Sequence, residues 1–530
     1  MNRFTGTWTL VRLILRCDRV RLPIWLLALV GLVGASAAGV QGIYDTAASR
    51  ASYARTAGGS AASIALSGPP VALDTIGGIT VFEVSQVAVV GVSLMAVFLT
   101  VRHTRTEEQA GRTELLRAGV LGRHADLAAI CVVMSGASVL VGVGTLLTFV
   151  GVGLPTTGSL AYAAAVTTLG LVFTGVALVA AQVSQHSRGA TGLSLAVLGL
   201  LYGLRAIGDV EGSWVTWASP IGWAQAVRPF ADERWWPLGL ALGFAAGTAA
   251  LAGWLAGRRD LGAGLVADRP GRARASRRLG SPLGLAARLQ RAAVIGWAVG
   301  MGALGAVYGS FGQDVQSMLD DNPEMADYFR QVAGEAAVTD AYFSVVVVFN
   351  AIIATGFTIS SVLRLRTEES DLHTEPALAT SVSRTRWALS WLAVTVLGSV
   401  LVVGTAGLLA GVVWAATSSD PGQVAALTAA QLSYLPAVLL LGALTFLVYG
   451  WQPHLAGAAY AALGVCFVIG WLGDLLRLPD WAMGISPFER TPLVPSVGYD
   501  AVPLVVMTAM AVTLAVVGER GFRRRDLLGG

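Results

Sequence analysis

The sequence contains no lysine, so all 36 of its Lys and Arg positions are arginines. The ATP-binding P-loop, G-x-x-x-x-G-K-[ST], needs its lysine to contact the β- and γ-phosphates of the nucleotide. The chain therefore has no P-loop, and we do not expect it to bind and hydrolyse ATP by itself. The arginines are spread between apolar blocks, so the net charge of +4 does not indicate nucleic-acid binding either.

Cysteine and histidine are also scarce. The three cysteines, Cys17, Cys131 and Cys466, have no metal-ligand spacing, and the five histidines form neither H-E-x-x-H nor a paired cluster. No Ser-His-Asp set, redox pair or carboxylate pair at a fixed site is present. The sequence thus predicts no catalytic residue, no metal ligand and no cofactor bound by this chain.

Charged residues make up only 13% of the chain, against roughly 25% in soluble proteins, while 55% of the residues are hydrophobic. The apolar residues fall in blocks of about 20, the length with which a helix crosses a hydrocarbon core of ~30 Å. We therefore predict an all-α polytopic membrane protein with about twelve transmembrane helices. The predicted spans are 22–43, 79–101, 126–153, 160–182, 190–208, 237–256, 293–311, 342–363, 387–416, 425–449, 456–473 and 501–518.

The arginines set the predicted orientation. If the amino terminus is cytoplasmic, the segments inside hold 28 of the 36 arginines. The positive-inside rule then places both termini in the cytoplasm. Ala35-Ser-Ala37 also resembles a signal-peptidase site. The repeat described next favours a retained first span, because the same pattern recurs near residue 290, where no signal peptide can be.

Two halves of six spans each are related in sequence. A first match pairs Leu13, Arg16, Arg19 and Trp25 with Leu285, Arg288, Arg291 and Trp297, and another pairs Ser219-Pro220 with Ser486-Pro487. The longest match joins Arg105-Thr-Glu-Glu-Gln-Ala-Gly-Arg-Thr-Glu-Leu to Arg366-Thr-Glu-Glu-Ser-Asp-Leu-His-Thr-Glu-Pro-Ala. Three matches in the same order indicate a duplication. With six spans in each half, the halves have parallel orientation.

The repeat also predicts the domain organisation. The first half covers 1–256, with an amphipathic helix at 4–21 on the inner membrane surface and a cytoplasmic loop at 102–125. An Arg-rich cytoplasmic linker follows at 257–280. The second half covers 281–530 and has its equivalent loop at 364–386.

The loop after the second span has the composition of a short helix. Thr106 is a candidate N-cap, and Gln109 stands three residues on, in a capping-box arrangement. On such a helix Glu107, Gly111 and Glu114 share one face. This acidic face with a glycine gap suits docking by another protein. A solvated helix kept out of the lipid is the plainer alternative, but the recurrence in the second half favours docking.

With these residues, the chain resembles ABC-2-type exporter permeases. The pattern Glu-x-x-x-Gly-x-x-Glu-Leu-Leu with a downstream arginine, after the second of six spans, is similar to the coupling region of that family. The doubled length and the run from Arg105 to Ala118 are similar to actinobacterial antibiotic-export permeases of the tetronasin-resistance type. The resemblance implies two parallel six-helix ABC-2-type (type V exporter-like) halves that export amphiphilic drugs or antibiotics.

The resemblance also implies the partners. These are two copies of a separate ABC ATP-binding subunit, which holds the ATP and Mg, together with the lipid bilayer and a small amphiphilic substrate; no nucleic acid is implied. The residues implied to contact the ATPase are Glu107, Glu108, Gly111, Arg112, Glu114 and Arg123 in the first half and Glu368, Glu369, Glu375 and Arg384 in the second.

The second half departs from this pattern. Leu372 replaces the glycine and His373 replaces the arginine. Pro376 follows the last acid and predicts a new helix that starts at Thr374. We therefore expect the second contact with the ATPase to be weaker or differently shaped.

Polar and aromatic residues within the spans are the candidates for a substrate cavity, because an ionisable group in lipid must face a cavity or a partner. They are Glu83, Gln86, Phe98, Asn350 and Phe357. Two alternatives stay open for them. Glu83 lies near the predicted outer interface, where it can simply be hydrated, and aromatic residues in a membrane bundle more often serve packing.

Two other functions compete with ATP-driven export. A proton-coupled antiporter shares the twelve spans and parallel halves and would use Glu83 as its proton site. Against it, Glu83 is the one acid well inside an apolar block. A membrane-embedded enzyme for lipid-linked substrates would need catalytic groups in the outer loops, and loop 312–341 has scattered acids but no histidine.

Overall fold

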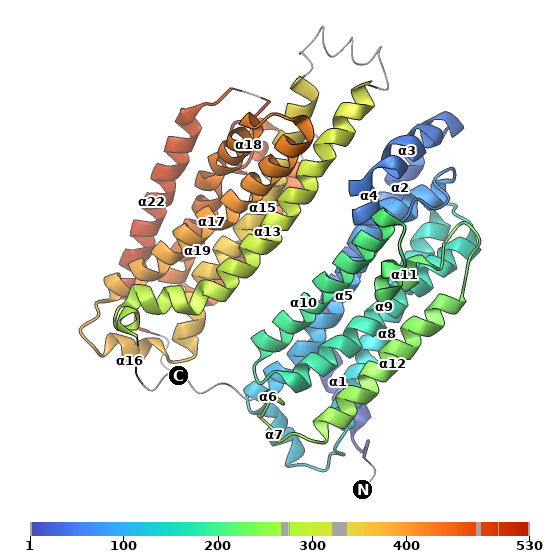
Figure 1. Cartoon of the computed structure of the whole chain (residues 1–530). Coiled ribbons are helices and arrows are strands. Elements are labelled where there is room, and N and C mark those ends of the chain that lie inside the picture. Colours follow the sequence, from blue (N-terminus) through green and yellow to red (C-terminus); the bar gives the residue numbers. More distant parts are fainter. Residues whose placement is uncertain are drawn as a thin grey trace. The chain divides into compact units, whose positions relative to one another are not determined.

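The computed structural model describes residues 3–266, 274, 276–320, 336–472, 479–496 and 498–527. The chain divides into two compact units, residues 1–271 and 272–530. The regular elements of the described residues are all helices, and within each unit the long helices run side by side (Figure 1). Part of the predicted linker 257–280 lies outside the described residues.

Twelve helices of the described chain are long and apolar enough to cross a membrane, six in each unit. This confirms the prediction of an all-α polytopic membrane protein with twelve spans. The spans are Arg21–Ile43, Ile76–Gln109, Ala125–Gly151, Thr156–Val183, Ser187–Glu211, Trp236–Ala256, Pro282–Gly312, Thr339–Ser370, Arg384–Ser418, Gly422–Trp451, Pro453–Gly470 and Ala501–Arg524.

The first unit is built around two interior spans, α5 and α9, which contribute more buried side chains to its core than its other helices do. Helices α3 and α4 lie at one end of this unit and α6 and α7 at the other (Figure 1). Its helices are α1 Thr7–Cys17, α2 Arg21–Ile43, α3 Ala47–Gly59, α4 Ala61–Ser67, α5 Ile76–Val101, α6 Glu107–Gln109, α7 Arg112–Arg117, α8 Ala125–Gly151, α9 Thr156–Val183, α10 Ser187–Glu211, α11 Pro220–Gln225 and α12 Trp236–Ala256.

The second unit packs its helices through small residues. A Cβ atom at Gly305 of α13 would lie 2.1 Å from the carbonyl oxygen of Ala406 of α17, so only glycine permits this approach. Proline breaks its fourth span into α18 and α19 at Pro436. Its helices are α13 Pro282–Asp320, α15 Ala336–Ser370, α16 Thr374–Leu378, α17 Arg384–Ser418, α18 Gly422–Ser433, α19 Leu435–Trp451, α20 Ala459–Leu472, α21 Asp480–Met483 and α22 Ala501–Arg524.

The two units differ in how the chain approaches the first span of each. The predicted amphipathic helix 4–21 is α1, which buries Leu10 and Ile14 and is separate from α2. In the second unit the matching stretch is continuous with the span, so the span begins at Pro282, and the predicted start at 293 is wrong. Proline explains the difference: Pro23 cannot donate a backbone hydrogen bond within a continuous helix, and the matching position holds Ile295.

Candidate functional site

The first coupling segment, residues 102–125, begins as an extension of the second span. Helix α5 leads through a π-helical turn at Arg102–Thr106 into α6. The predicted helix start at Thr106 is therefore wrong, because Thr106 has helical backbone angles and its side chain caps nothing. Extending a formed helix by a residue is easier than nucleating a new one, so the span continues into the charged sequence.

Gly111 interrupts this helix. It has a left-handed backbone with φ +71°, and α7 starts directly after it. Glycine adopts this conformation without the steric cost of a Cβ atom. The break separates Glu107 from Glu114, so the predicted common helical face for these acids and Gly111 is not formed.

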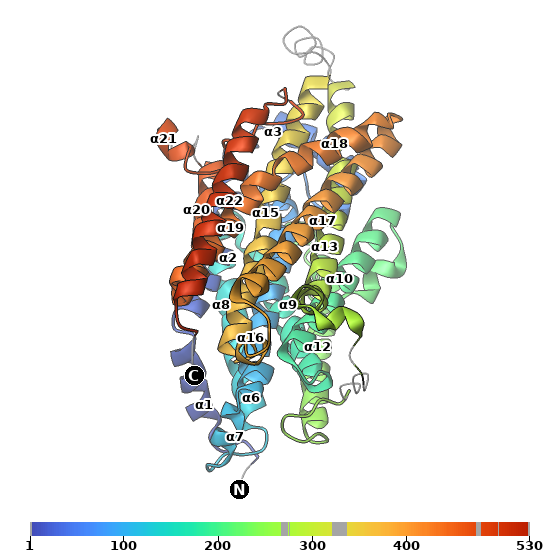
Figure 2. The ribbon, with the colours of Figure 1, turned by 90° about the vertical axis from the view of Figure 1, so that its left-hand side faces the viewer.

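The second coupling segment, residues 364–386, has the same backbone plan with different residues. Leu372, at the position that matches Gly111, is also left-handed with φ +59°. For a residue with a Cβ atom this conformation costs about 1–2 kcal/mol. Helix α16 then begins at Thr374, which confirms the helix start predicted from Pro376. Figure 2 shows α16 near one end of the second unit and α18 near the other.

In each segment the first glutamate of the Glu-Glu pair contacts the residue directly after the left-handed one, which is Arg112 after Gly111 and His373 after Leu372. Glu107 accepts hydrogen bonds from Nε and Nη2 of Arg112 at 2.5 and 2.9 Å. The hydrogen bond and the negative charge of Glu107 raise the pKa of Arg112. In the second segment Glu368 contacts Nδ1 of His373 at 3.1 Å and is also paired with Arg364. Glu107 stays partly exposed, whereas Glu368 is buried.

The second glutamate of the first segment is held from three sides. Glu108 accepts hydrogen bonds from Nη1 and Nη2 of Arg259 at 2.6 and 2.9 Å, and from the backbone N–H of Gly262 at 2.7 Å. Nη1 of the fully buried Arg105 lies 3.3 Å from the same carboxylate. Arg259 follows the end of the sixth span, so the pair ties the second span to the sixth.

The second half repeats this arrangement. Glu369 pairs with Nη1 and Nη2 of Arg525 at 2.5 and 2.6 Å and accepts a hydrogen bond from the hydroxyl of Tyr449 at 2.7 Å. Burial is the largest influence on the pKa of Arg525 and lowers it. The hydrogen bonds and charges of Glu369 and Tyr449 together outweigh burial and raise the pKa above the ordinary value. We call Glu108–Arg259 and Glu369–Arg525 the two latches.

Neither latch arginine was predicted from the sequence. Each is the second residue of an Arg-Arg-Asp-Leu repeat, which occupies 258–261 after the sixth span and 524–527 after the twelfth. The repeat was visible in the sequence, but its partners are 151 and 156 residues away. Proximity of such distant residues does not follow from spacing alone.

The downstream arginines of the two segments also have equivalent positions. Nη2 of Arg123 donates to the carbonyl oxygen of Gly257 at 2.5 Å, and Nη1 of Arg384 donates to that of Arg525 at 2.7 Å. Both carbonyls lie just beyond the helix of a sixth span, where a cation satisfies free acceptors and the negative end of the helix dipole. Within the structure these arginines hold the segment to the span.

The surfaces that the two segments present to solvent differ. Glu114 and Glu375 are both exposed. On α7, Leu115 is 77% exposed, and behind this helix lies a pocket of about 100 Å³. The pocket lining includes Leu10 and Ile14 of α1, Leu116 of α7, Leu127 and Ile130 of α8, and both Glu107 and Glu108. In the second segment, by contrast, Ala377 and Leu378 pack against the buried cluster that contains Trp387.

Three of the candidate cavity residues lie on α5 of the first unit. Glu83 accepts a hydrogen bond from the hydroxyl of Tyr53 of α3. Burial, and then the negative charge of Glu83, raise the pKa of Tyr53. Gln86 is half-buried, and Phe98 is 40% exposed with its ring centroid 6.4 Å from that of Trp25. The structure therefore does not gather these three side chains around one cavity.

The two candidates in the second unit are part of its core. Phe357 is fully buried and packs near Trp297. Nδ2 of the buried Asn350 donates to Oε1 of Gln431 at 3.4 Å, while its Oδ1 atom has no hydrogen-bond partner in the described residues. Neither residue lines the pocket found among α15, α17, α19 and α22 of this unit.

Comparison with known proteins covers nearly the whole chain. The family described as "Multidrug efflux system permease Rv1217c, C-terminal domain" matches residues 279–523. Over 526 residues the chain is 37% identical to the multidrug efflux system permease protein Rv1217c of Mycobacterium tuberculosis. The aligned region covers 99% of this chain and 96% of Rv1217c.

Proposed function

The chain belongs to the family of Rv1217c-type multidrug efflux permeases, and from this premise we propose that it is the membrane-spanning subunit of an ATP-driven exporter of amphiphilic drugs. It is a multi-pass protein of the bacterial cell membrane with twelve spans. The proposal adds an energy source: two copies of a separate ABC ATP-binding subunit, which hold the ATP and Mg. It also adds the orientation given by the arginines, with both termini in the cytoplasm.

The observation that carries the proposal is the twofold occurrence of the coupling segment. Both segments follow an even number of spans, so they emerge on the same side of the membrane. Each has a left-handed break, an exposed acid on a short helix after it, and a buried glutamate latched to the sixth span of its half. A chain without lysine has no P-loop of its own, which supports a separate ATP-binding subunit. The two equivalent docking segments support two copies of that subunit.

The latches give docking a mechanical consequence. A displacement of a short helix such as α7 is transmitted to Glu108 through a few residues of backbone. Glu108 in turn accepts a hydrogen bond from Arg259. The second and sixth spans of one half therefore move together at their cytoplasmic ends. Rigid shifts of packed helices are a common way to open and close a binding site.

The first segment supports the stronger docking. Its exposed Leu115 and Glu114 sit in front of an apolar pocket with an acidic edge, a surface suited to an apolar side chain flanked by a basic one. The second segment uses its equivalent helix partly for internal packing.

The test uses the tagged full-length chain, purified from its native membranes together with its ATP-binding subunit. Replacing Glu114 with Arg should weaken co-purification and lower ATP turnover of the complex in lipid nanodiscs. Glu211→Arg is the matched control, because Glu211 is an exposed acid at the end of α10 that faces the other side of the membrane.

Unchanged assembly and ATP turnover in Glu114→Arg would show that the first segment is not the docking site. Drug efflux that stops on adding an uncoupler but continues after ATP depletion would instead indicate a proton antiporter.

A further inference from the structure

A pocket of about 50 Å³ lies in the first unit between α5 and α9, at the end that carries α3 and α4. On α5 it extends from Gly78 to Val89, ~16 Å of helix at 1.5 Å per residue. Residues of the connection after α4, of α11 and of the turn at Arg228–Pro229 complete its lining. We call it the α5–α9 pocket. It shares no residue with the predicted cavity set.

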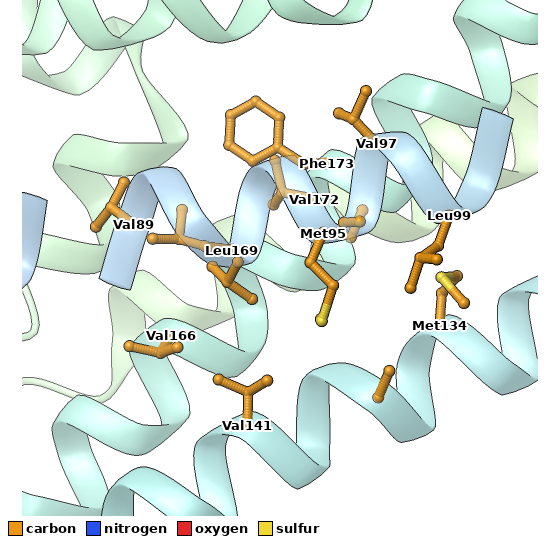
Figure 3. Packing of buried hydrophobic residues seen from close by; sticks show 14 of the residues in the cluster. Val89, Met95, Val97, Leu99, Met134, Val141, Val166, Leu169, Val172 and Phe173 are labelled. Carbon is orange, nitrogen blue, oxygen red and sulfur yellow. The ribbon is translucent and has the colours of Figure 1, made fainter. Parts of the chain in front are cut away.

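Most of the lining is apolar. Val89, Val166 and Leu169 form its floor and belong to the packed core of the unit, where Figure 3 shows them at one end of the cluster. Arg228 is the one charged residue of the lining, and its Nε atom lies 2.9 Å from Asp232. Asp232 also pairs with Arg234, so the lining presents apolar walls and one arginine, and it contains no acid.

Two polar groups of the lining have unused hydrogen-bonding capacity. The hydroxyl of Tyr162, which is only 4% exposed, has its nearest polar contact at 3.5 Å, to Ser85. The Ser85 hydroxyl already donates to the carbonyl of Val81 at 2.5 Å. Oε1 of Gln225 is buried without a hydrogen-bond partner in the described residues, while Nε2 of the same side chain donates to Ser67. Because a buried polar atom without a partner is destabilising, such atoms point to a ligand.

The rim of the pocket is held in a strained conformation. Arg228 and Phe230 both have left-handed backbones, with φ +52° and +64°. Such residues are rare when they carry a Cβ atom, and they cluster at binding sites. The Phe230 ring is seated over Gly77 and Gly158, where a Cβ atom would lie 2.5 and 2.3 Å from it. These two glycines let the ring hold the turn in place.

The connection after α4, which lines the pocket, is held in place by a buried arginine of the fifth span. Arg205, 1% exposed, donates to the carbonyls of Ile64 and Leu66 at 3.4 and 3.1 Å, and Tyr202 donates to Leu66 at 2.5 Å. An arginine buried within a span indicates a functional role by default. Here it holds the residues that lead into the pocket wall. At about 50 Å³ the pocket encloses only one end of a drug-sized ligand, so the rest of the ligand extends beyond the rim.

We propose that the α5–α9 pocket binds an uncharged amphiphile that carries a hydroxyl group and a carbonyl or ether oxygen. The hydroxyl of the ligand donates to Oε1 of Gln225. The hydroxyl of Tyr162 turns from its long contact with Ser85, at 3.5 Å, and donates to the ligand oxygen. Its apolar part covers Val89, Val166 and Leu169. A cation is disfavoured, because its desolvation has no compensating acid in the lining. The proposal rests on the export function, of which it specifies the substrate class.

The experiment uses the full-length chain in lipid nanodiscs, without ATP and without the ATP-binding subunit, so that coupling to ATP does not enter. The probe is 4-(hydroxymethyl)benzophenone, an uncharged photoreactive molecule with a hydroxyl and a carbonyl. Irradiation followed by peptide mass spectrometry should place saturable labelling on residues 82–89 and 162–169. Tyr162→Phe and Gln225→Leu should each weaken labelling about fivefold to tenfold, the loss of one hydrogen bond.

Tyr434→Phe is the matched control, because Tyr434 is an equally buried tyrosine at the break of the fourth span of the second unit, and its hydroxyl reaches the carbonyl of Pro492. Ala165→Leu fills the pocket and should abolish labelling there, with the melting temperature reporting that the fold is kept. The wild-type labelling map does not depend on any variant. Labelling spread evenly over the lipid-facing helices, or equal labelling by a quaternary ammonium benzophenone, would overturn the proposal while leaving ATP coupling untouched.

Discussion

The two coupling segments share a backbone and a latch but not a surface. Each contains a Glu-Glu pair, a left-handed residue and a short helix, and each is tied to the sixth span of its half. The first offers exposed Leu115 in front of a pocket, whereas the second turns Leu378 toward its own core. The backbone plan and the latch are therefore common to both halves, whereas the exposed surface differs between them.

The largest effect is expected from the latches, the feature that the halves share. Arg525→Ala leaves the buried carboxylate of Glu369 without its arginine, which costs about 3–5 kcal/mol. Arg259→Ala should cost less, because Arg105 still lies beside Glu108. Both variants should therefore show a clearly lowered melting temperature in detergent. The double variant Glu369→Ala/Arg525→Ala should recover part of the loss, because it removes both members of the ion pair. No loss on breaking one of the two latches would contradict the equivalence of the halves.

The next effect concerns the surface on which the halves differ. Leu115→Asp should weaken binding of the ATP-binding subunit about tenfold or more, since it places an unpaired charge on an exposed apolar surface that docking would bury. Pro376→Asp at the matching position of the second segment should have a smaller effect. Binding of the purified subunit to the chain in nanodiscs, measured by surface plasmon resonance, checks both. Equal losses would mean that the segments dock equally.

A smaller effect is expected at the left-handed residues. Gly111→Leu should lower the free energy of unfolding by about 1–2 kcal/mol and leave the fold intact, because no atom lies within 4 Å of a Cβ placed there and Leu372 shows that leucine is accepted. Leu372→Gly should not destabilise by more than about 1 kcal/mol, since relief of backbone strain offsets the lost side chain. Denaturant unfolding of both variants measures these changes. A Gly111→Leu chain that fails to fold would show that the shared backbone plan is not interchangeable.

The smallest effect is expected at the ion pair of Glu107 and Arg112, which is partly exposed to solvent. Arg112→His copies His373 of the second half, and a surface ion pair contributes only about 0–1 kcal/mol. The melting temperature should hardly move, and the strength of binding to the ATP-binding subunit should report whether the arginine serves the partner instead. A drop as large as that of Arg259→Ala would contradict the division between latch and surface.

The sequence was sufficient for features that depend on composition and repetition. All twelve spans were predicted, because an apolar block of about 20 residues has few other structures in a membrane. The coupling segments were found through the repeat, and the helix at Thr374 through Pro376. The roles assigned to the segment residues stay predictions.

What the sequence did not provide depends on competition between local choices and on long-range contact. Thr106 has the chemistry of an N-cap, but the span helix continues through it because elongation is easier than a new start. The latches join residues that are far apart in the chain. The α5–α9 pocket depends on the left-handed backbones of Arg228 and Phe230, for which neither residue type gives a signal.

The latches also bear on the order in which the protein is made. Both partners of the first latch, Glu108 and Arg259, precede the second unit in the chain, and both partners of the second latch lie within that unit. During synthesis both residues of the first latch are therefore made before the second unit is. Once residues 258–261, Arg-Arg-Asp-Leu, have been synthesised, the first half already contains both residues of its own latch.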